Sequence, residues 1–108
     1  MVTVPAKVQW CKDRQMKEQA IQAKVLKFLE KKGFVTCKVI SANKAGILDI
    51  IACSPEGRYW EIEAKTLTGR ASKLQEYRVQ QVHANGGISF IFWGFDDFLV
   101  KFNNCTVI

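Results

Sequence analysis

Two short apolar runs joined by a tight turn constrain this 108-residue chain more than any other feature. The runs are residues 46–53 and 58–65, and the residues between them are Ser-Pro-Glu-Gly. Runs rich in Ile, Tyr and Trp on either side of such a turn are typical of a β-hairpin. Pro55 suits the first position of a type I turn, and Gly57 suits the left-handed residue that closes a three-residue loop.

That loop also fixes which residues face one another. It pairs Ser54 with Arg58, and counting outward it places Asp49 opposite Glu63. Because side chains alternate along a strand, one face of the hairpin is charged and the other is apolar. The charged face carries Asp49, Glu61, Glu63 and Lys65, and the core face carries Leu48, Ile50, Ala52, Trp60, Ile62 and Ala64. A slip of one residue would move Asp49 and Glu63 to opposite faces.

The predicted pairing makes two carboxylates direct neighbours. Like charges across a strand pair are destabilising, and a carboxylate within an apolar strand needs a partner or a raised pKa. A divalent cation between Asp49 and Glu63 would turn this repulsion into a binding site, because hard cations take oxygen ligands. Alternatively, Lys65 neutralises the pair on a solvated face, and the charge pattern fits both interpretations. Glu61, two residues before Glu63, is then a secondary or structural carboxylate.

Composition limits the class of protein. With 48% apolar and 24% charged residues, the chain is expected to form one globular domain, residues 1–108, with residues 1–12 as an N-terminal arm. A formal charge of +6 suits a polyanionic partner such as nucleic acid. Four cysteines without C-x-x-C spacing argue against zinc, and Cys37 and Cys53 are expected in the core. Reduced thiols and no secretory or membrane segment predict an intracellular protein.

Two helices are predicted from apolar spacing. From about residue 14 to 32, Ile21 and Val25 belong to an apolar stripe that Gly33 ends. Glu18 begins the buried stripe of this helix, either as a first-turn acid favoured by the helix dipole or as a further site acid. Lysines form its basic side: Lys17, Lys24, Lys27 and Lys31. The second helix spans about residues 73–84, with Ser72 or a near neighbour as its N-cap and with Gln75 turned toward the sheet.

The remaining segments complete a fold prediction. Residues 34–40 and 88–94 read as strands, the second buried on both faces, and Asp96 as the cap of a short helix through Phe102. The order αβββαβ predicts an α/β/α sandwich around a small mixed sheet. A helical crossover makes its last strand parallel to its neighbour.

The residues Gly46, Asp49, Glu63-Ala64-Lys65 and Gln75, with Glu18 upstream, resemble the signature of the PD-(D/E)xK nucleases. The compact spacing is similar to the VRR-NUC branch and to the archaeal Holliday junction resolvases. The likeness spans about residues 18–94, and Leu48 stands where the family usually has Pro. It implies a restriction-endonuclease-like fold.

This resemblance also implies an activity. The chain would be a Mg²⁺-dependent DNA endonuclease, with Mn²⁺ as a substitute, acting as a homodimer on four-way junctions or other branched DNA. It assigns metal binding to Asp49, Glu63 and the Ala64 carbonyl, and further catalytic roles to Lys65, Gln75 and Glu18. It also implies that the basic residues near this site contact DNA, and these are Lys44, Arg70, Lys73 and Lys24. The protein would work in the cytoplasm of a bacterium or, if viral, of its host.

Two other classes of protein fit the same pattern. One is a basic DNA-binding module of this fold that does not cleave. The other is a structural or interaction protein in which the acids and Lys65 form a surface ion-pair network of small net stability.

Overall fold

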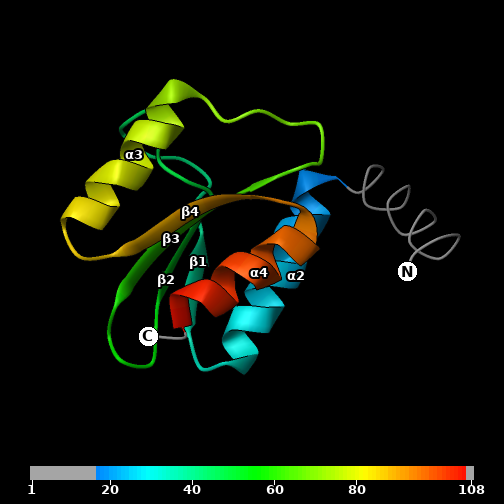
Figure 1. Cartoon of the computed structure of the whole chain (residues 1–108), viewed down its shortest axis with the longest axis vertical. Helices are drawn as coiled ribbons and strands as arrows, with labels where there is room; N and C mark the ends of the chain where they lie inside the picture. The colour runs from blue at the N-terminus through cyan, green and yellow to red at the C-terminus, as the bar shows by residue number, and fades with distance from the viewer. Residues whose placement is uncertain (1–16, 107–108) are drawn as a thin grey trace, which may run out of the picture.

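A computed structural model describes residues 17–106, so the expected N-terminal arm (1–12) lies outside the described part. Within this part, four strands form one sheet in the order β1-β2-β3-β4 and three helices pack on it (Figure 1). The elements are α2 (Glu18–Lys31), β1 (Val35–Lys38), β2 (Ile50–Cys53), β3 (Tyr59–Lys65), α3 (Lys73–Ala84), β4 (Ile88–Trp93) and α4 (Gly94–Thr106).

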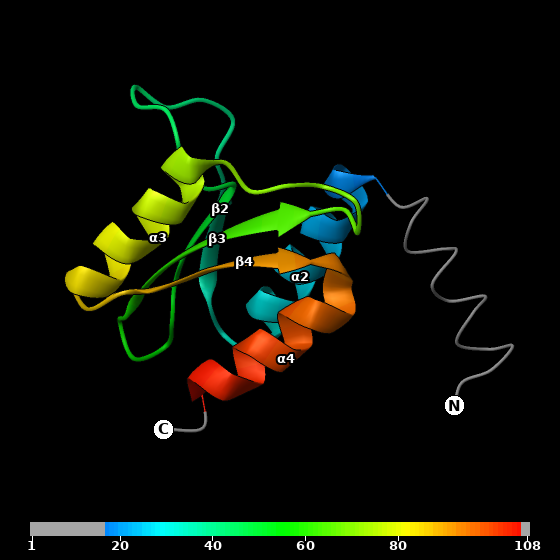
Figure 2. The same cartoon turned by 45° about the horizontal axis from the view of Figure 1, so that its top comes forward.

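The elements form three layers. Helices α2 and α4 cover one face of the sheet, and α3 covers the other (Figures 1 and 2). Strands β1, β2 and β3 are antiparallel neighbours, whereas β3 and β4 are parallel and are joined through α3. The predicted α/β/α sandwich with a mixed sheet is therefore confirmed, and α4 extends the predicted order to αβββαβα.

The hairpin has the predicted register. Ile51 pairs with Glu61, and the amide of Gly57 donates to the Ser54 carbonyl (2.8 Å). Gly57 has φ +90°, the left-handed conformation that glycine adopts most readily. One residue beyond the last backbone pair, Asp49 lies beside Glu63, because its amide donates to the Glu63 carboxylate instead of to a backbone carbonyl (3.0 Å).

The hydrophobic core lies between the sheet and the α2–α4 layer. The predicted core face of the hairpin is buried there, and Leu48 is buried as well. The core is rich in aromatic rings, and Phe28 meets Phe95, Phe98 and Phe102 edge to face. This packing holds α2 against α4, and α2 also contacts β3 and β1.

Three predictions about local structure are corrected. Cys37 and Cys53 are exposed instead of buried, because α3 packs mainly on β4 and β3 and leaves the outer face of β1 and β2 open. Asp96 does not cap the last helix, since α4 already begins at Gly94. The carboxylate that binds the backbone there belongs to Asp97, which accepts a hydrogen bond from the Trp93 amide (2.8 Å).

Among residues 17–106, no helix has the length and apolar character needed to cross a membrane.

Candidate functional site

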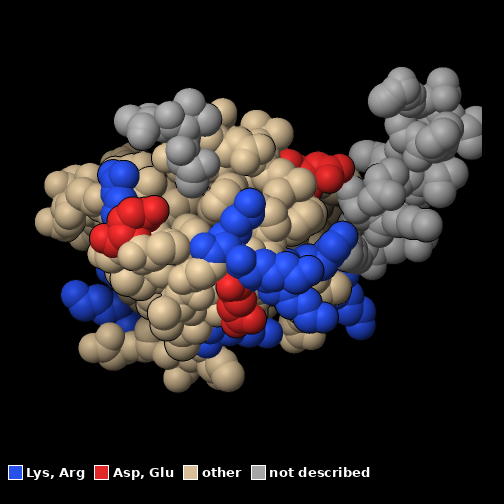
Figure 3. All heavy atoms as spheres, turned by 90° about the horizontal axis from the view of Figure 1, so that it is seen from below, with Lys and Arg blue, Asp and Glu red and all other residues tan. Residues whose placement is uncertain are grey.

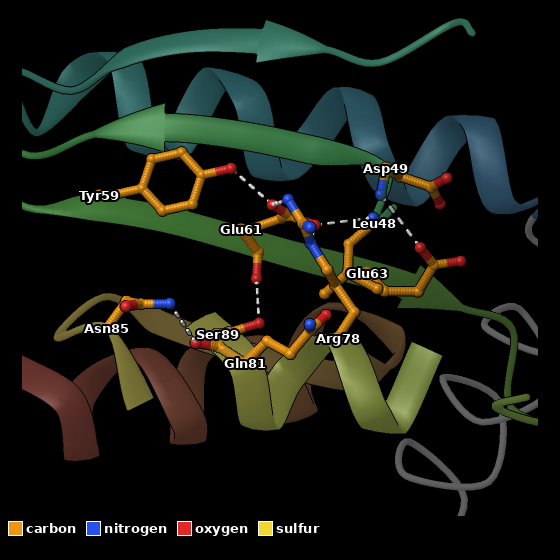
Figure 4. A network of polar contacts seen from close by, with 9 residues as sticks. All are labelled: Leu48, Asp49, Tyr59, Glu61, Glu63, Arg78, Gln81, Asn85 and Ser89. Atoms are coloured by element: carbon orange, nitrogen blue, oxygen red, sulfur yellow. Dashed lines mark hydrogen bonds and ion pairs between the residues drawn. The ribbon is translucent and has the colours of Figure 1, made fainter. Parts of the chain in front are cut away.

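Three carboxylates from three elements meet at one end of the sheet. Glu18 begins α2, Asp49 directly precedes β2, and Glu63 lies in β3. Each offers an oxygen that lies within 4.8 Å of the others. Figure 4 shows Asp49 and Glu63 side by side, on neighbouring segments of the hairpin. The structure therefore brings together the three acids that the sequence had placed on a predicted hairpin and a predicted helix.

Asp49 is held on both sides. Its amide donates to Glu63 Oε1 (3.0 Å), and its Oδ2 accepts a hydrogen bond from Gln22 Nε2 (2.8 Å). Gln22 lies one turn after Glu18 on the buried side of α2 and is only 5% exposed. Asp49 is thus held by a helix through its side chain and by a strand through its backbone amide.

Burial sets the electrostatics of this cluster. Burial and the neighbouring charge of Asp49 raise the pKa of Glu63 to about 7, although Lys65 opposes this rise. Burial and Asp49 also raise the pKa of Glu18. Both shifts have the sign expected when carboxylates are brought together away from water. The site is therefore a place where negative charge is concentrated and poorly compensated.

Two further predicted residues contact Glu63. Lys65 Nζ lies 3.5 Å from Glu63 Oε2, and Gln75 Nε2 donates to the same oxygen (3.1 Å). Gln75 Oε1 accepts the Ser72 amide, and the Ser72 hydroxyl accepts the Gln75 amide, so the two residues form a capping box. Gln75 thus both caps α3 and orients a carboxylate of the cluster.

The donor atoms fit a hard divalent cation. All three clustered side chains are carboxylates, the ligands that Mg²⁺, Mn²⁺ and Ca²⁺ prefer. Beside them, Gln22 Oε1 is a buried oxygen without a hydrogen-bond partner among the described residues. Buried polar atoms are normally satisfied, and this oxygen is free to accept a hydrogen bond from a water bound to a cation. The Ala64 carbonyl, the other predicted ligand, belongs to β3 between Glu63 and Lys65.

Glu61 is a buried carboxylate of another kind. It is fully buried and accepts two hydrogen bonds from Arg78, through Nε (2.8 Å) and Nη2 (2.9 Å). The Tyr59 hydroxyl and the Leu48 amide also donate to it (Figure 4). Burial alone would raise the pKa of Glu61, but these hydrogen bonds together hold it below its ordinary value. Glu61 is therefore a structural carboxylate outside the cluster of Glu18, Asp49 and Glu63.

The two glutamates of β3 hold consecutive amides of the chain. Glu61 accepts from Leu48, and Glu63 accepts from Asp49. This arrangement clamps the segment that precedes β2 and places the Asp49 side chain. Sequence reasoning missed the roles of Gln22 and Arg78. A glutamine in the apolar stripe of a predicted helix, and an arginine three residues after Gln75, are the signals that would have found them.

The predicted DNA contacts are all exposed but lie in two layers. Lys44 lies in the loop before Asp49, Arg70 in the loop after β3, and Lys73 begins α3. Lys24 belongs to the other layer, with its ammonium 4.9 Å from the centre of the Phe95 ring. Basic side chains gather in a broad area on the face seen from below (Figure 3).

Comparisons with known proteins agree with this architecture. No family model matches the sequence, and no curated protein matches it. A solved structure described as a VRR_NUC domain superimposes with a TM-score of 0.67 at 21% identity, covering 78% of this chain and 94% of that one. A second, a VRR_NUC domain protein, has a TM-score of 0.64 at 17% identity and covers 82% and 86%. The predicted likeness is confirmed at the level of structure, and this chain has the fold of VRR_NUC domain proteins.

Proposed function

We propose that this protein is a metal-dependent endonuclease that hydrolyses DNA phosphodiester bonds. The observation that carries the proposal is the cluster of Glu18, Asp49 and Glu63 with Lys65 and Gln75 at its edge. Carboxylates in this grouping suit a hydrolytic cation, and a lysine beside them suits a phosphate. The VRR_NUC fold supports the same class of reaction, since it is a nuclease-family fold.

Hydrolysis of a phosphodiester requires an attacking water, a polarised phosphorus and a stabilised leaving oxygen. A divalent cation held by Asp49, Glu63 and Glu18, with the Ala64 carbonyl, would supply Lewis acidity and lower the pKa of a bound water. Gln75 keeps the Glu63 carboxylate oriented, and Gln22 does the same for Asp49. Lys65 lies where its ammonium can neutralise charge that develops on the phosphate or orient the attacking water.

We infer that the substrate is DNA recognised by its shape. A net charge of +6 favours binding to phosphates, and a chain of this size has little surface for reading a long sequence. Lys44, Arg70 and Lys73 would contact the backbone near the acids, and Lys24 would contact it on the α2 side. We further propose a homodimer that cuts the two strands of branched DNA such as a four-way junction. Sedimentation of the protein with and without junction DNA tests this assembly.

The decisive experiment compares cleavage of labelled four-way junction, flap, duplex and single-stranded DNA with Mg²⁺ or Mn²⁺. Wild-type protein should cut at least one of them, and Glu63→Ala should cut none. Glu76→Ala, which removes an exposed carboxylate from α3, is the matched control and should cut normally. Failure of the wild type to cut any substrate while it binds DNA tightly would contradict the proposal and favour a binding module.

A further inference from the structure

A groove runs along α3, and none of its lining residues belongs to the acid cluster. It consists of two cavities, of about 350 and 230 Å³, which share Arg78 and Gln81 in their walls. The larger one is also lined by Tyr59 and Asn85, and the smaller one extends to Lys44. We call these cavities together the α3 groove.

The side of α3 that faces this groove carries a polar stripe beside Leu74, Tyr77 and Val82. Gln75, Arg78, Gln81 and Asn85 follow one another at spacings of three or four residues, so they form one stripe along the helix. The first of them is hydrogen-bonded to Glu63, and the stripe therefore begins at the acid cluster. Ten residues of helix rise about 15 Å, which is the length of the stripe. A helix side that packs on the protein is normally apolar, so this stripe needs another explanation.

Arg78 is fixed in the middle of the groove. Glu61 holds its Nε and Nη2, and the Arg78 side chain is nevertheless 28% exposed and borders both cavities. A guanidinium has more donors than these two contacts use, so a rigidly held Arg78 can still bind an anion. Figure 4 shows it reaching from α3 across β3 toward Glu61. An arginine held in advance loses little conformational entropy when an anion binds.

The other lining residues suit a particular polymer. Tyr77 is 58% exposed beside the smaller cavity and Tyr59 is 41% exposed beside the larger one, so two aromatic rings are accessible. Lys44 adds positive charge at one end of the groove. Single-stranded nucleic acid is bound by this combination of aromatic rings for stacking, cations for phosphates and amides for base edges. In a duplex, the backbone would be accessible but the paired bases would not offer their edges to the amide side chains of Gln81 and Asn85.

We propose that the α3 groove holds a single-stranded segment of DNA directly beside the scissile phosphate. At about 3.4 Å per nucleotide, 15 Å of groove accommodates roughly four nucleotides. This inference rests on the proposed function and narrows its substrate to branched DNA that carries a flap or tail.

Adjacent glutamines of α3 provide a matched test. Gln81 borders both cavities, whereas Gln80 is exposed and lines neither of them. The same change of charge can therefore be made at both positions, and only the change at Gln81 lies in the groove. The variants are Gln81→Glu and Gln81→Lys, with Gln80→Glu and Gln80→Lys as controls. Binding of fluorescent oligo(dT), about 15 nucleotides long, and of a duplex of equal length is measured by anisotropy in EDTA, so that no cleavage occurs.

Gln81→Glu should weaken oligo(dT) binding about fivefold or more, the effect of one unit charge about 4 Å from a phosphate in water. Gln81→Lys should strengthen it, and the Gln80 variants should change it less than about twofold. Equal effects at the two positions, or equal effects on duplex and single strand, would overturn the proposal.

This binding assay is independent of catalysis. If the wild type cleaves DNA but the Gln81 and Gln80 variants bind oligo(dT) alike, only the proposal for the groove is refuted. If the Gln81 variants differ from the Gln80 variants but the wild type does not cleave, the groove is supported and the nuclease proposal is refuted.

Discussion

Glu61 and Glu63 lie two residues apart on the same side of β3, yet replacing each by glutamine should change stability in opposite directions. In the cation-free protein, Glu63 has a pKa of about 7 against an ordinary value of 4.5. At 1.36 kcal/mol per pH unit, the charged carboxylate costs the folded state about 3 kcal/mol at pH 8. Glu63→Gln removes that charge, so it should stabilise the protein by up to about 3 kcal/mol, less whatever the Gln75 and Lys65 contacts contribute.

The pH dependence identifies the cause. A raised pKa in the folded state means that the cost of Glu63 is absent below about pH 4.5, grows as the pH rises, and is complete above about pH 7. The gain from Glu63→Gln should therefore fall below about 1 kcal/mol at pH 5. A cavity or packing effect of the substitution would not change with pH in this way.

Glu61→Gln should act in the other direction. The pKa of Glu61 is held below its ordinary value, so the charged form stabilises the folded state. Glutamine cannot hold Arg78 through two oxygens, and breaking a buried pair of this kind costs about 3–5 kcal/mol when no acceptor remains. Because glutamine keeps one acceptor and Arg78 is partly exposed, a loss of about 2–3 kcal/mol is expected. The loss should be similar at pH 5 and pH 8, since Glu61 stays charged at both.

Urea unfolding in EDTA at both pH values, followed by the fluorescence of buried Trp60, measures these differences. Our account of the site is refuted if Glu63→Gln destabilises the protein at pH 8, or if its gain is as large at pH 5. It is also refuted if Glu61→Gln is neutral, because the Arg78 contacts would then contribute nothing.

Three further outcomes are expected. Mg²⁺ or Mn²⁺ at about 100 times its Kd should stabilise the wild type by about 2.7 kcal/mol and so raise its melting temperature. This rise should be larger at pH 8 than at pH 5.5, and Asp49→Ala should abolish it. Lys65→Ala should keep the melting temperature within a few degrees but remove detectable cleavage, and a variant that cuts at the wild-type rate would exclude a catalytic role. Gly46→Ala should destabilise by about 1–3 kcal/mol in urea unfolding, because Gly46 has φ +87° and a Cβ there would lie 3.0 Å from Leu74 Cβ; an unchanged midpoint would contradict this.

The site was predictable where short-range patterns determine it. The Pro55–Gly57 turn fixed the hairpin register, and that register alone placed Asp49 beside Glu63. A cap at Ser72 or a near neighbour was expected to start α3, and the apolar spacing of the helix turned Gln75 toward the sheet, where it contacts Glu63. Each of these inferences depends on residues within a few positions of one another, where backbone geometry leaves few alternatives.

Other features depend on contacts between distant segments. Cys37 and Cys53 have the apolar neighbours of core residues, and they are exposed only because α3 covers half of the sheet. The pairing of Glu61 with Arg78 joins residues 17 positions apart, and that of Gln22 with Asp49 joins residues 27 apart. Charge pattern shows that such residues need partners, but it does not choose the partner, because that choice depends on how the layers are stacked.

Arg78 connects the two parts of the molecule that the proposals concern. On one side it borders the α3 groove, and on the other it holds Glu61, which accepts the Leu48 amide next to Asp49. An anion that binds Arg78 from the groove would therefore contact a residue that is linked, through Glu61 and the Leu48 amide, to the segment that carries Asp49. The buried charge of Glu61 costs desolvation that an apolar residue would avoid. The same carboxylate keeps the segment before β2 in place, and it would keep Arg78 rigid for a ligand.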